Sequence, residues 1–172
     1  LSNSCQDSRA RYRARVLQGM PVNRVALASV VEAACQLCEW RFQQANLDIR
    51  QPQLSDESYV MADTLALEQV FVNLLLNALE ASRQHPDARH VQLSVEKAAH
   101  HALLVHVDDQ GPGIPDEQQA EVFNAFHSTR AEGLGLGLAI SRSLMEAMGG
   151  ALSVSHSPLF SGARFSARLR CA

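Results

Sequence analysis

The stretch HVQLSVEKAAHHALLVHVDD, residues 90–109, constrains the fold more than any other part of the chain. Apolar and polar residues alternate on both sides of a polar turn at His100 and His101, which is the pattern of two strands joined in a hairpin. Neighbouring turn residues point in different directions, so these two histidines predict a solvated turn and no metal site. The fold must therefore contain an antiparallel pair of strands.

Helical and strand patterns lie on both sides of this hairpin. Asp63 or Thr64 is the expected cap of a long helix over residues 65–83. Further helices are expected over 28–47, 117–122 and 138–148, the last of them stopped by the glycine pair 149–150. Further strands are expected at 22–27, 48–54 and 59–63, and in a closing hairpin of 151–157 with 163–169. The helix over 28–47 is expected to bury Val30, Val31, Ala34, Leu37, Cys38, Arg41 and Phe42.

This order of elements predicts an α+β fold, a two-layer α/β sandwich. Its sheet is mixed and mostly antiparallel, with helices on one face. It lacks the regular strand and helix alternation of a Rossmann domain. A chain of 172 residues that is 47% hydrophobic suits one folded domain, expected over residues 20–172. Residues 1–19 are polar and hold the basic cluster SRARYRAR, and they are expected to form a linker or the end of a preceding helix.

Charge and cysteine content exclude several classes of partner. A net charge of −3 gives no general attraction to nucleic acid or anionic membranes. No apolar run approaches the roughly 18 residues of a transmembrane helix, so no direct membrane contact is expected from this domain. Cys35 and Cys38 lie within a helical pattern and lack a second ligand pair, so they predict packing and no zinc site. Free thiols favour a cytoplasmic location, with membrane anchoring of a longer protein left open.

The long helix contains three polar residues on one face. Asn73, Asn77 and Glu80 are spaced at i, i+4 and i+7. A solvated helix flank and a magnesium site are both compatible with this spacing. Asparagine oxygen is a suitable hard ligand for Mg²⁺, which usually shares its coordination shell with phosphates and water.

The stretch VDDQGPGIP follows the first hairpin. Its glycines suit a tight turn. They also suit a site where Asp109 accepts a hydrogen bond from an exocyclic amine, because Gly111 and Gly113 let the backbone approach a flat ring closely. A buried carboxylate in that role would select adenine over guanine, since the wrong base leaves the charge unpaired.

Two further motifs precede the last predicted helix. In VFNAFHSTR, Phe123 and Phe126 are expected to anchor the core, and the hydroxyls and cation that follow suit a triphosphate. The run EGLGLGLAIS leads directly into a helix. It fits either a flexible loop or a phosphate site, because a helix N-terminus favours an anion.

These motifs, in this order, resemble the catalytic, ATP-binding domain of sensor histidine kinases. The wider superfamily includes gyrase, the heat-shock chaperone ATPases and the mismatch-repair ATPases. NLLLNALEAS is similar to the N box, DDQGPGIP to the G1 box, VFNAF to the F box and GLGLGLAIS to the G2 box. The resemblance covers roughly residues 20–170 and implies a Bergerat fold with an ATP lid.

The resemblance also implies a ligand set of ATP and Mg²⁺. Asn77 would coordinate the metal with Asn73 nearby, and Asp109 would hold the adenine amine. Arg130 would pair with the terminal phosphate through two hydrogen bonds of its guanidinium group. Asn73 and Arg130 are the implied catalytic residues. The implied nucleotide-binding residues are Asn73, Asn77, Glu80, Asp109, Gly111, Gly113, Ile114, Ser128, Thr129, Arg130, Gly133, Leu134, Gly135, Leu136, Gly137 and Leu138.

The implied reaction is transfer of the γ-phosphoryl group to a histidine on a separate dimerisation domain, for relay to a response-regulator aspartate. Residues 1–19 would then be a linker or the tail of the dimerisation helix. None of the seven histidines stands in a phosphoacceptor context. Gyrase-like relatives carry a glutamate base where this chain has Asn73, which cannot take a proton, so efficient hydrolysis is disfavoured. A nucleotide-binding regulatory module without transfer is the other alternative.

Overall fold

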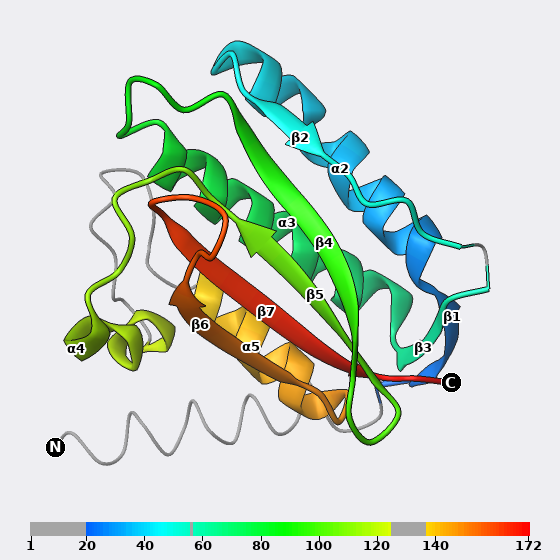
Figure 1. Ribbon diagram of the computed structural model, residues 1–172. Helices are drawn as coiled ribbons and strands as arrows, with labels where there is room; N and C mark the ends of the chain where they lie inside the picture. Colours follow the sequence, from blue (N-terminus) through cyan, green and yellow to red (C-terminus); the bar gives the residue numbers. More distant parts are fainter. Residues whose placement is uncertain (1–19, 56, 125–136) are drawn as a thin grey trace, which may run out of the picture.

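The computed structural model describes residues 20–55, 57–124 and 137–172. Figure 1 labels its helices and strands. In chain order they are β1 (Asn23–Ala26), α2 (Leu27–Gln44), β2 (Asp48–Arg50), β3 (Tyr59–Ala62), α3 (Thr64–Ser82), β4 (His90–Ala98), β5 (Ala102–Asp108), α4 (Asp116–Gln119), the 3-10 turn η1 (Glu121–Phe123), α5 (Gly137–Ala147), β6 (Ala151–His156) and β7 (Ala163–Arg170).

The main layer is a five-stranded sheet with the order β2-β4-β5-β7-β6. Only the β2–β4 pair is parallel, and the other three pairs are antiparallel. Helices α2, α3 and α5 lie together on one face of this sheet (Figure 1). Strands β1 and β3 form a separate antiparallel pair. The predicted two-layer sandwich with a mixed, mostly antiparallel sheet is confirmed.

The core lies between the sheet and these helices. Most residues of the central strands β5 and β7 are buried, among them Val105 and Val107 on β5 and Phe165 on β7. They meet the buried side of α3, where Phe71 and Leu74 are almost fully enclosed. Each such side chain contributes roughly 1.5–3 kcal/mol on burial, which holds the helices and the sheet in a fixed relation.

Local sequence signals predicted most boundaries of the helices and strands correctly. Asp63 caps α3 as predicted, and its side chain accepts a hydrogen bond of 2.9 Å from the Ala66 N–H. His100 and His101 form the expected turn between β4 and β5, with φ values of 60° and 52°. The closing hairpin is β6 and β7. The helix predicted over 117–122 is replaced by the shorter α4 and the 3-10 turn η1.

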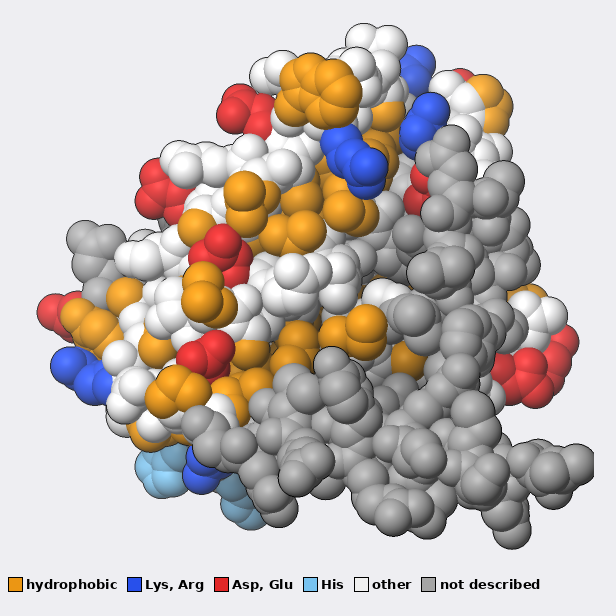
Figure 2. Space-filling model, turned by 180° about the vertical axis from the view of Figure 1, so that it is seen from behind, with side chains coloured by type: hydrophobic (Ala, Val, Ile, Leu, Met, Phe, Trp, Pro, Cys, Tyr) orange, Lys and Arg blue, Asp and Glu red, His pale blue; other side chains and the backbone are white. Residues whose placement is uncertain are grey.

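Helix α2 differs from its prediction. It ends at Gln44, three residues earlier than expected, and Leu37 and Arg41 are exposed although both were predicted to face the core. Leu37 lies roughly 100° around the helix from the middle of the buried stripe, so it falls outside the packed face. Leu37 and Trp40 are 65% and 66% exposed. Figure 2, which views the helical side, shows hydrophobic side chains on that surface.

The two cysteines of α2 are packing residues, as predicted. Both are buried, and burial is the main factor that raises the pKa of Cys35 to about 12 and of Cys38 to about 11. Thiols with such pKa values are poor nucleophiles and poor metal ligands at neutral pH. Among the helices that the structure describes, none is long and apolar enough to cross a lipid bilayer.

Candidate functional site

Asp109 follows directly after β5 and is only 1% exposed. Its Oδ1 accepts hydrogen bonds from the backbone N–H groups of Gly111 at 3.0 Å and Ala163 at 3.1 Å. Its Oδ2 has no hydrogen-bond partner among the described residues. Burial raises the pKa of this carboxyl, and the two backbone N–H groups oppose the shift. The described residues therefore hold the side chain by one oxygen and leave the other available to a further donor.

Gly162 makes the contact between Asp109 and β7 sterically possible. A Cβ at Gly162 would lie 2.0 Å from the Asp109 Oδ1 and 2.2 Å from its carbonyl oxygen. Only glycine lets the start of β7 pass this close to the carboxylate. Sequence reasoning missed Gly162 and Ala163, because SGAR between two strands indicates only a turn.

The two glycines of the G1-like motif have separate roles. A Cβ at Gly111 would lie 2.6 Å from the carbonyl oxygen of Ala81, so this glycine lets the turn pack on the end of α3. Gly113 has a φ of +78°, a conformation that favours glycine. Ile114, which follows it, packs partly buried against the core.

Side chains that sequence reasoning missed also hold this turn. Ser82 Oγ accepts a hydrogen bond of 3.1 Å from the Gln110 N–H. The Gln110 side chain accepts at Oε1 from the N–H groups of Arg89 and His90, at 2.6 Å and 3.1 Å. The turn is therefore fixed to both α3 and the start of β4, so its shape does not depend on the glycines alone.

Asp108 is fully buried beside Asp109 but has a different environment. Arg164 donates to both of its oxygens, from Nε at 2.9 Å and from Nη2 at 3.0 Å. Ser157 donates a third hydrogen bond at 2.8 Å. Both oxygens of Asp108 therefore already accept hydrogen bonds within the protein, whereas Asp109 has one oxygen that accepts no hydrogen bond from the described residues.

Asn73 connects α3 to the first turn of α5. Its Nδ2 donates to the carbonyl of Gly137 at 3.3 Å and to the hydroxyl of Ser141 at 3.0 Å, and its Oδ1 accepts from Gln69 at 2.8 Å. Ser141 is fully buried and was not singled out from the sequence. Among the described residues, a Cβ at Gly137 would approach the Asn73 Cγ alone, at 4.0 Å, so these neighbours do not require glycine there. Leu138, the next residue, packs partly buried against the core.

The polar flank of α3 connects the two ends of the candidate site. Along α3, the half-buried Asn77 and Glu80 lie between Asn73, which contacts α5, and Ser82, which contacts the turn at residues 109–113. The rise per residue puts Asn73 and Ser82 about 14 Å apart along the helix axis. A buried carboxylate thus lies near one end of this flank, and an α-helix N-terminus, which favours anions, lies at the other.

Part of the predicted site lies outside the described residues. Phe126 and the predicted ATP lid are in this part of the chain. So are the predicted ligand residues Ser128, Thr129, Arg130, Gly133, Leu134, Gly135 and Leu136. Phe123 is described and is buried, with its ring edge-on to Phe165 at 6.0 Å, which confirms its predicted role as a core anchor.

Residues 62–172 match the family model described as histidine kinase-, DNA gyrase B- and HSP90-like ATPase. The chain belongs to this ATPase family. It is 38% identical over 145 residues to the C4-dicarboxylate transport sensor protein DctB of Rhizobium meliloti, covering 84% of the chain and 23% of the relative. It is 36% identical to the sensor protein FixL of Bradyrhizobium diazoefficiens, covering 81% and 28%. The chain thus spans about a quarter of the length of these relatives.

Solved structures give the same assignment. The catalytic domain of histidine kinase ThkA superposes with a TM-score of 0.76 at 26% identity, covering 88% of this chain and 96% of that one. Full-length ShkA in complex with AMPPNP gives a TM-score of 0.75 at 28% identity, covering 89% of this chain and 32% of that one. The chain is a histidine kinase catalytic domain of the ATP-binding type, as the sequence predicted.

Loss of the Asn73 side chain is expected to loosen α5 from α3. Asn73→Ala removes the donor to Gly137 and Ser141, and we expect the free energy of unfolding to fall by about 1–2 kcal/mol. Urea denaturation measures this change. Gln69→Ala is the matched control, because it removes only an exposed partner of Asn73. Equal unfolding free energies for wild type and Asn73→Ala would contradict a structural link through this amide.

Through Asp109, the stability of the domain and its affinity for ATP are expected to change with pH in opposite directions. Because burial raises its pKa in the folded chain, its contribution to stability is full below the ordinary aspartate pKa of about 4 and is lost as pH rises through the raised value. An ATP contact through the ionised carboxylate, the contact that the sequence predicts for Asp109, should weaken as pH falls through the same window. An NMR titration of the carboxyl carbon should give a midpoint above about 4. A midpoint at or below that value would contradict this expectation.

Proposed function

We propose that this domain binds ATP together with Mg²⁺ and donates the γ-phosphoryl group to a histidine on a separate dimerisation domain. The phosphoryl group then passes to an aspartate of a response regulator. The observation that carries this proposal is the buried Asp109, held at Oδ1 by two backbone N–H groups and unpartnered at Oδ2 within the described chain. An adenine amine would donate to that oxygen, whereas the oxygen of guanine would face an unpaired charge.

The rest of the nucleotide would follow the flank of α3. With the base at the turn 109–113, the phosphates would lie near the start of α5, where an α-helix N-terminus favours negative charge. Gly137 and Leu138 open that helix, and the predicted lid residues precede it. Glu80 and Ile114 would border the base and sugar in this arrangement.

Asn77 is the proposed magnesium ligand. Its half-buried amide lies midway along the flank of α3 that joins the two ends of the site, and an amide oxygen suits Mg²⁺. A single protein ligand fits this ion, which takes most of its remaining ligands from phosphates and water. When bound, the metal would neutralise charge on the phosphates. Asn73 would position the start of α5, and Arg130 would pair with the terminal phosphate.

The environment of Asn73 supports transfer over hydrolysis. Its amide donates to two groups of α5, and an amide cannot remove a proton from water. Without a general base at this position, the domain would hold ATP until an acceptor histidine arrives, so catalysis would come mainly from positioning and charge neutralisation.

A transfer assay tests the proposal. The chain is incubated with Mg²⁺ and ATP labelled at the γ-phosphate, with or without the dimerisation domain of a relative such as DctB. We expect acid-labile label on that domain only when both proteins are present, and none when its acceptor histidine is replaced by glutamine. Release of inorganic phosphate without an acceptor would indicate a gyrase-like ATPase. ATP binding without transfer to any of several dimerisation domains would indicate a regulatory module.

A further inference from the structure

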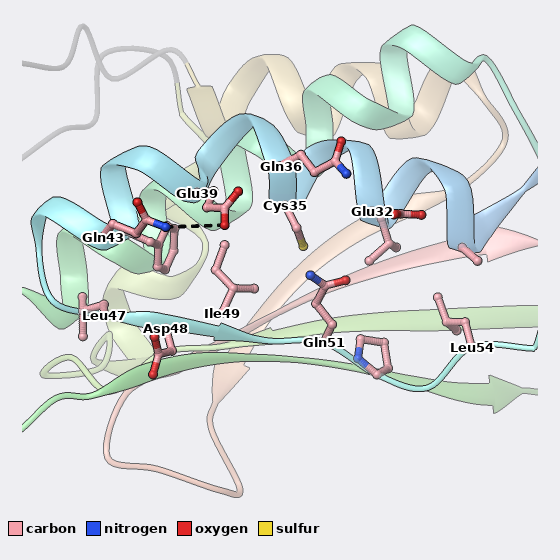
Figure 3. Close-up of a pocket in the computed structure, with 14 residues that line it drawn as sticks. Glu32, Cys35, Gln36, Glu39, Gln43, Leu47, Asp48, Ile49, Gln51 and Leu54 are labelled. Carbon is pink, nitrogen blue, oxygen red and sulfur yellow. Dashed lines mark hydrogen bonds between the residues drawn. The ribbon is translucent and has the colours of Figure 1, made fainter.

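A groove of about 620 Å³ runs between α2 and the segment 47–54, which contains β2. Apolar side chains including Val31, Phe42 and Leu54 line its floor, and polar groups make up the larger part of its accessible surface. Figure 3 shows Cys35 pointing from α2 toward this segment, and Ile49 pointing back toward the helix. A volume of this size lies within the range of ordinary ligand sites. The groove can accommodate several side chains and is separate from the flank of α3 described above.

The lining of the groove is negatively charged. Glu32 and Glu39 lie two helical turns apart on α2, and Asp48 lines the groove from β2. Glu39 accepts a hydrogen bond of 3.5 Å from the uncharged Gln43, and none of the ion pairs among the described residues involves it. The described lining contains no lysine or arginine. A groove with an apolar floor and acidic walls favours a partner that has positive charge and some apolar surface.

We propose that this groove binds the arginine segment of this same chain, residues 9–15, with the sequence RARYRAR. The segment carries four arginines, one tyrosine and no acidic residue. The whole chain has a net charge of −3, so with +4 in this segment the other residues carry −7. The arginines would pair with the carboxylates of the groove, and Tyr12 would cover part of its floor.

The length of the chain permits this contact. Residues 9–19 span up to about 35 Å when extended, and the described chain then leads through β1 directly into α2. The groove begins at Ala28, and from there to Gln43 the helix rises about 22 Å. Because segment and groove belong to one chain, the effective concentration is in the millimolar range, so a weak contact is sufficient.

Binding of the segment would restrain the part of the chain that leads into the domain. When the segment is bound, the polypeptide immediately before β1 is held against α2, and whatever precedes it loses freedom relative to the domain. Individual exposed ion pairs are weak and are screened by salt, so the arginine segment would dissociate from the groove as ionic strength rises. This inference does not depend on the proposed phosphotransfer.

NMR spectra of the full chain test the proposal. Replacing Arg9, Arg11, Arg13 and Arg15 by glutamine should shift the amide signals of groove residues such as Glu32, Gln36 and Gln51. Replacing the same four arginines by lysine should leave those signals largely in place, because the charge is kept. Raising the salt concentration of the wild type to about 0.5 M should move the groove signals toward the glutamine variant. The same spectra report whether each variant is folded.

A reciprocal variant and a control complete the test. Glu32→Gln with Glu39→Gln should shift the signals of the arginine segment, whereas Glu57→Gln with Glu117→Gln, outside the groove, should not. Groove shifts that are unchanged by tenfold dilution support binding within one chain. Shifts that fade on dilution would assign the groove to a second copy. Shifts on another surface, or none beyond residues next to the substitutions, would overturn the proposal.

Discussion

Asp109→Asn is expected to reduce ATP affinity by at least about 100-fold while the domain stays folded. The substituted amide can present an N–H where the adenine amine needs an acceptor, and the charge that favours the amine is lost. Stability should be equal or higher at neutral pH, because burial disfavours the ionised form of Asp109. Calorimetric titration with ATP measures the affinity, and thermal unfolding measures the stability.

The adjacent Asp108 provides a matched control with the opposite expectation. Asp108→Asn breaks the buried two-pronged contact with Arg164, so it should cost about 3 kcal/mol of stability. Its oxygens face Arg164 and Ser157 and leave none for a base, so ATP affinity per folded molecule should change far less. The opposite pattern, with Asp109→Asn unstable and Asp108→Asn unable to bind ATP, would show that the base carboxylate is misassigned.

Gly162→Ala is the second substitution with a large expected effect. The new Cβ would fall 2.0 Å from the Asp109 Oδ1, so either β7 or the carboxylate must move. Movement breaks the Ala163 hydrogen bond that orients Asp109. We expect a stability loss of about 1–3 kcal/mol and a loss of ATP affinity close to that of Asp109→Asn.

Chemical denaturation and ATP titration of the same samples measure both effects. Gly137→Ala is a matched control for stability, because a Cβ there meets no atom of the described residues closer than the Asn73 Cγ at 4.0 Å. We expect its unfolding free energy to stay near that of the wild type. A Gly162→Ala variant with unchanged stability and ATP affinity would mean that this close approach has no role in the site.

Prediction from the sequence succeeded where the signal is local. The turn at 109–113 follows from its glycines, and the cap of α3 follows from Asp63. The residues that orient Asp109 from elsewhere were missed, because Ala163 lies 54 positions away and contributes only its backbone N–H. No side-chain pattern can indicate such a partner before the strand order is known.

The error on α2 has a different physical origin. Periodicity shows that a helix has a buried side but places the edges of that side poorly, so Leu37 was assigned to the core. In the structure the buried stripe of α2 includes Leu27 and Cys35 and leaves Leu37 and Trp40 exposed. The extent of a packed face depends on the neighbouring α3 and sheet, which the sequence of α2 does not encode.

The most direct test of the account is calorimetric titration of the chain with ATP and, separately, with GTP in the presence of Mg²⁺. We expect a saturating heat with ATP, little or none with GTP, and no sustained heat after saturation. Equal binding of the two nucleotides would contradict the role of Asp109. Sustained heat from ATP turnover would contradict a domain that holds ATP for an acceptor histidine.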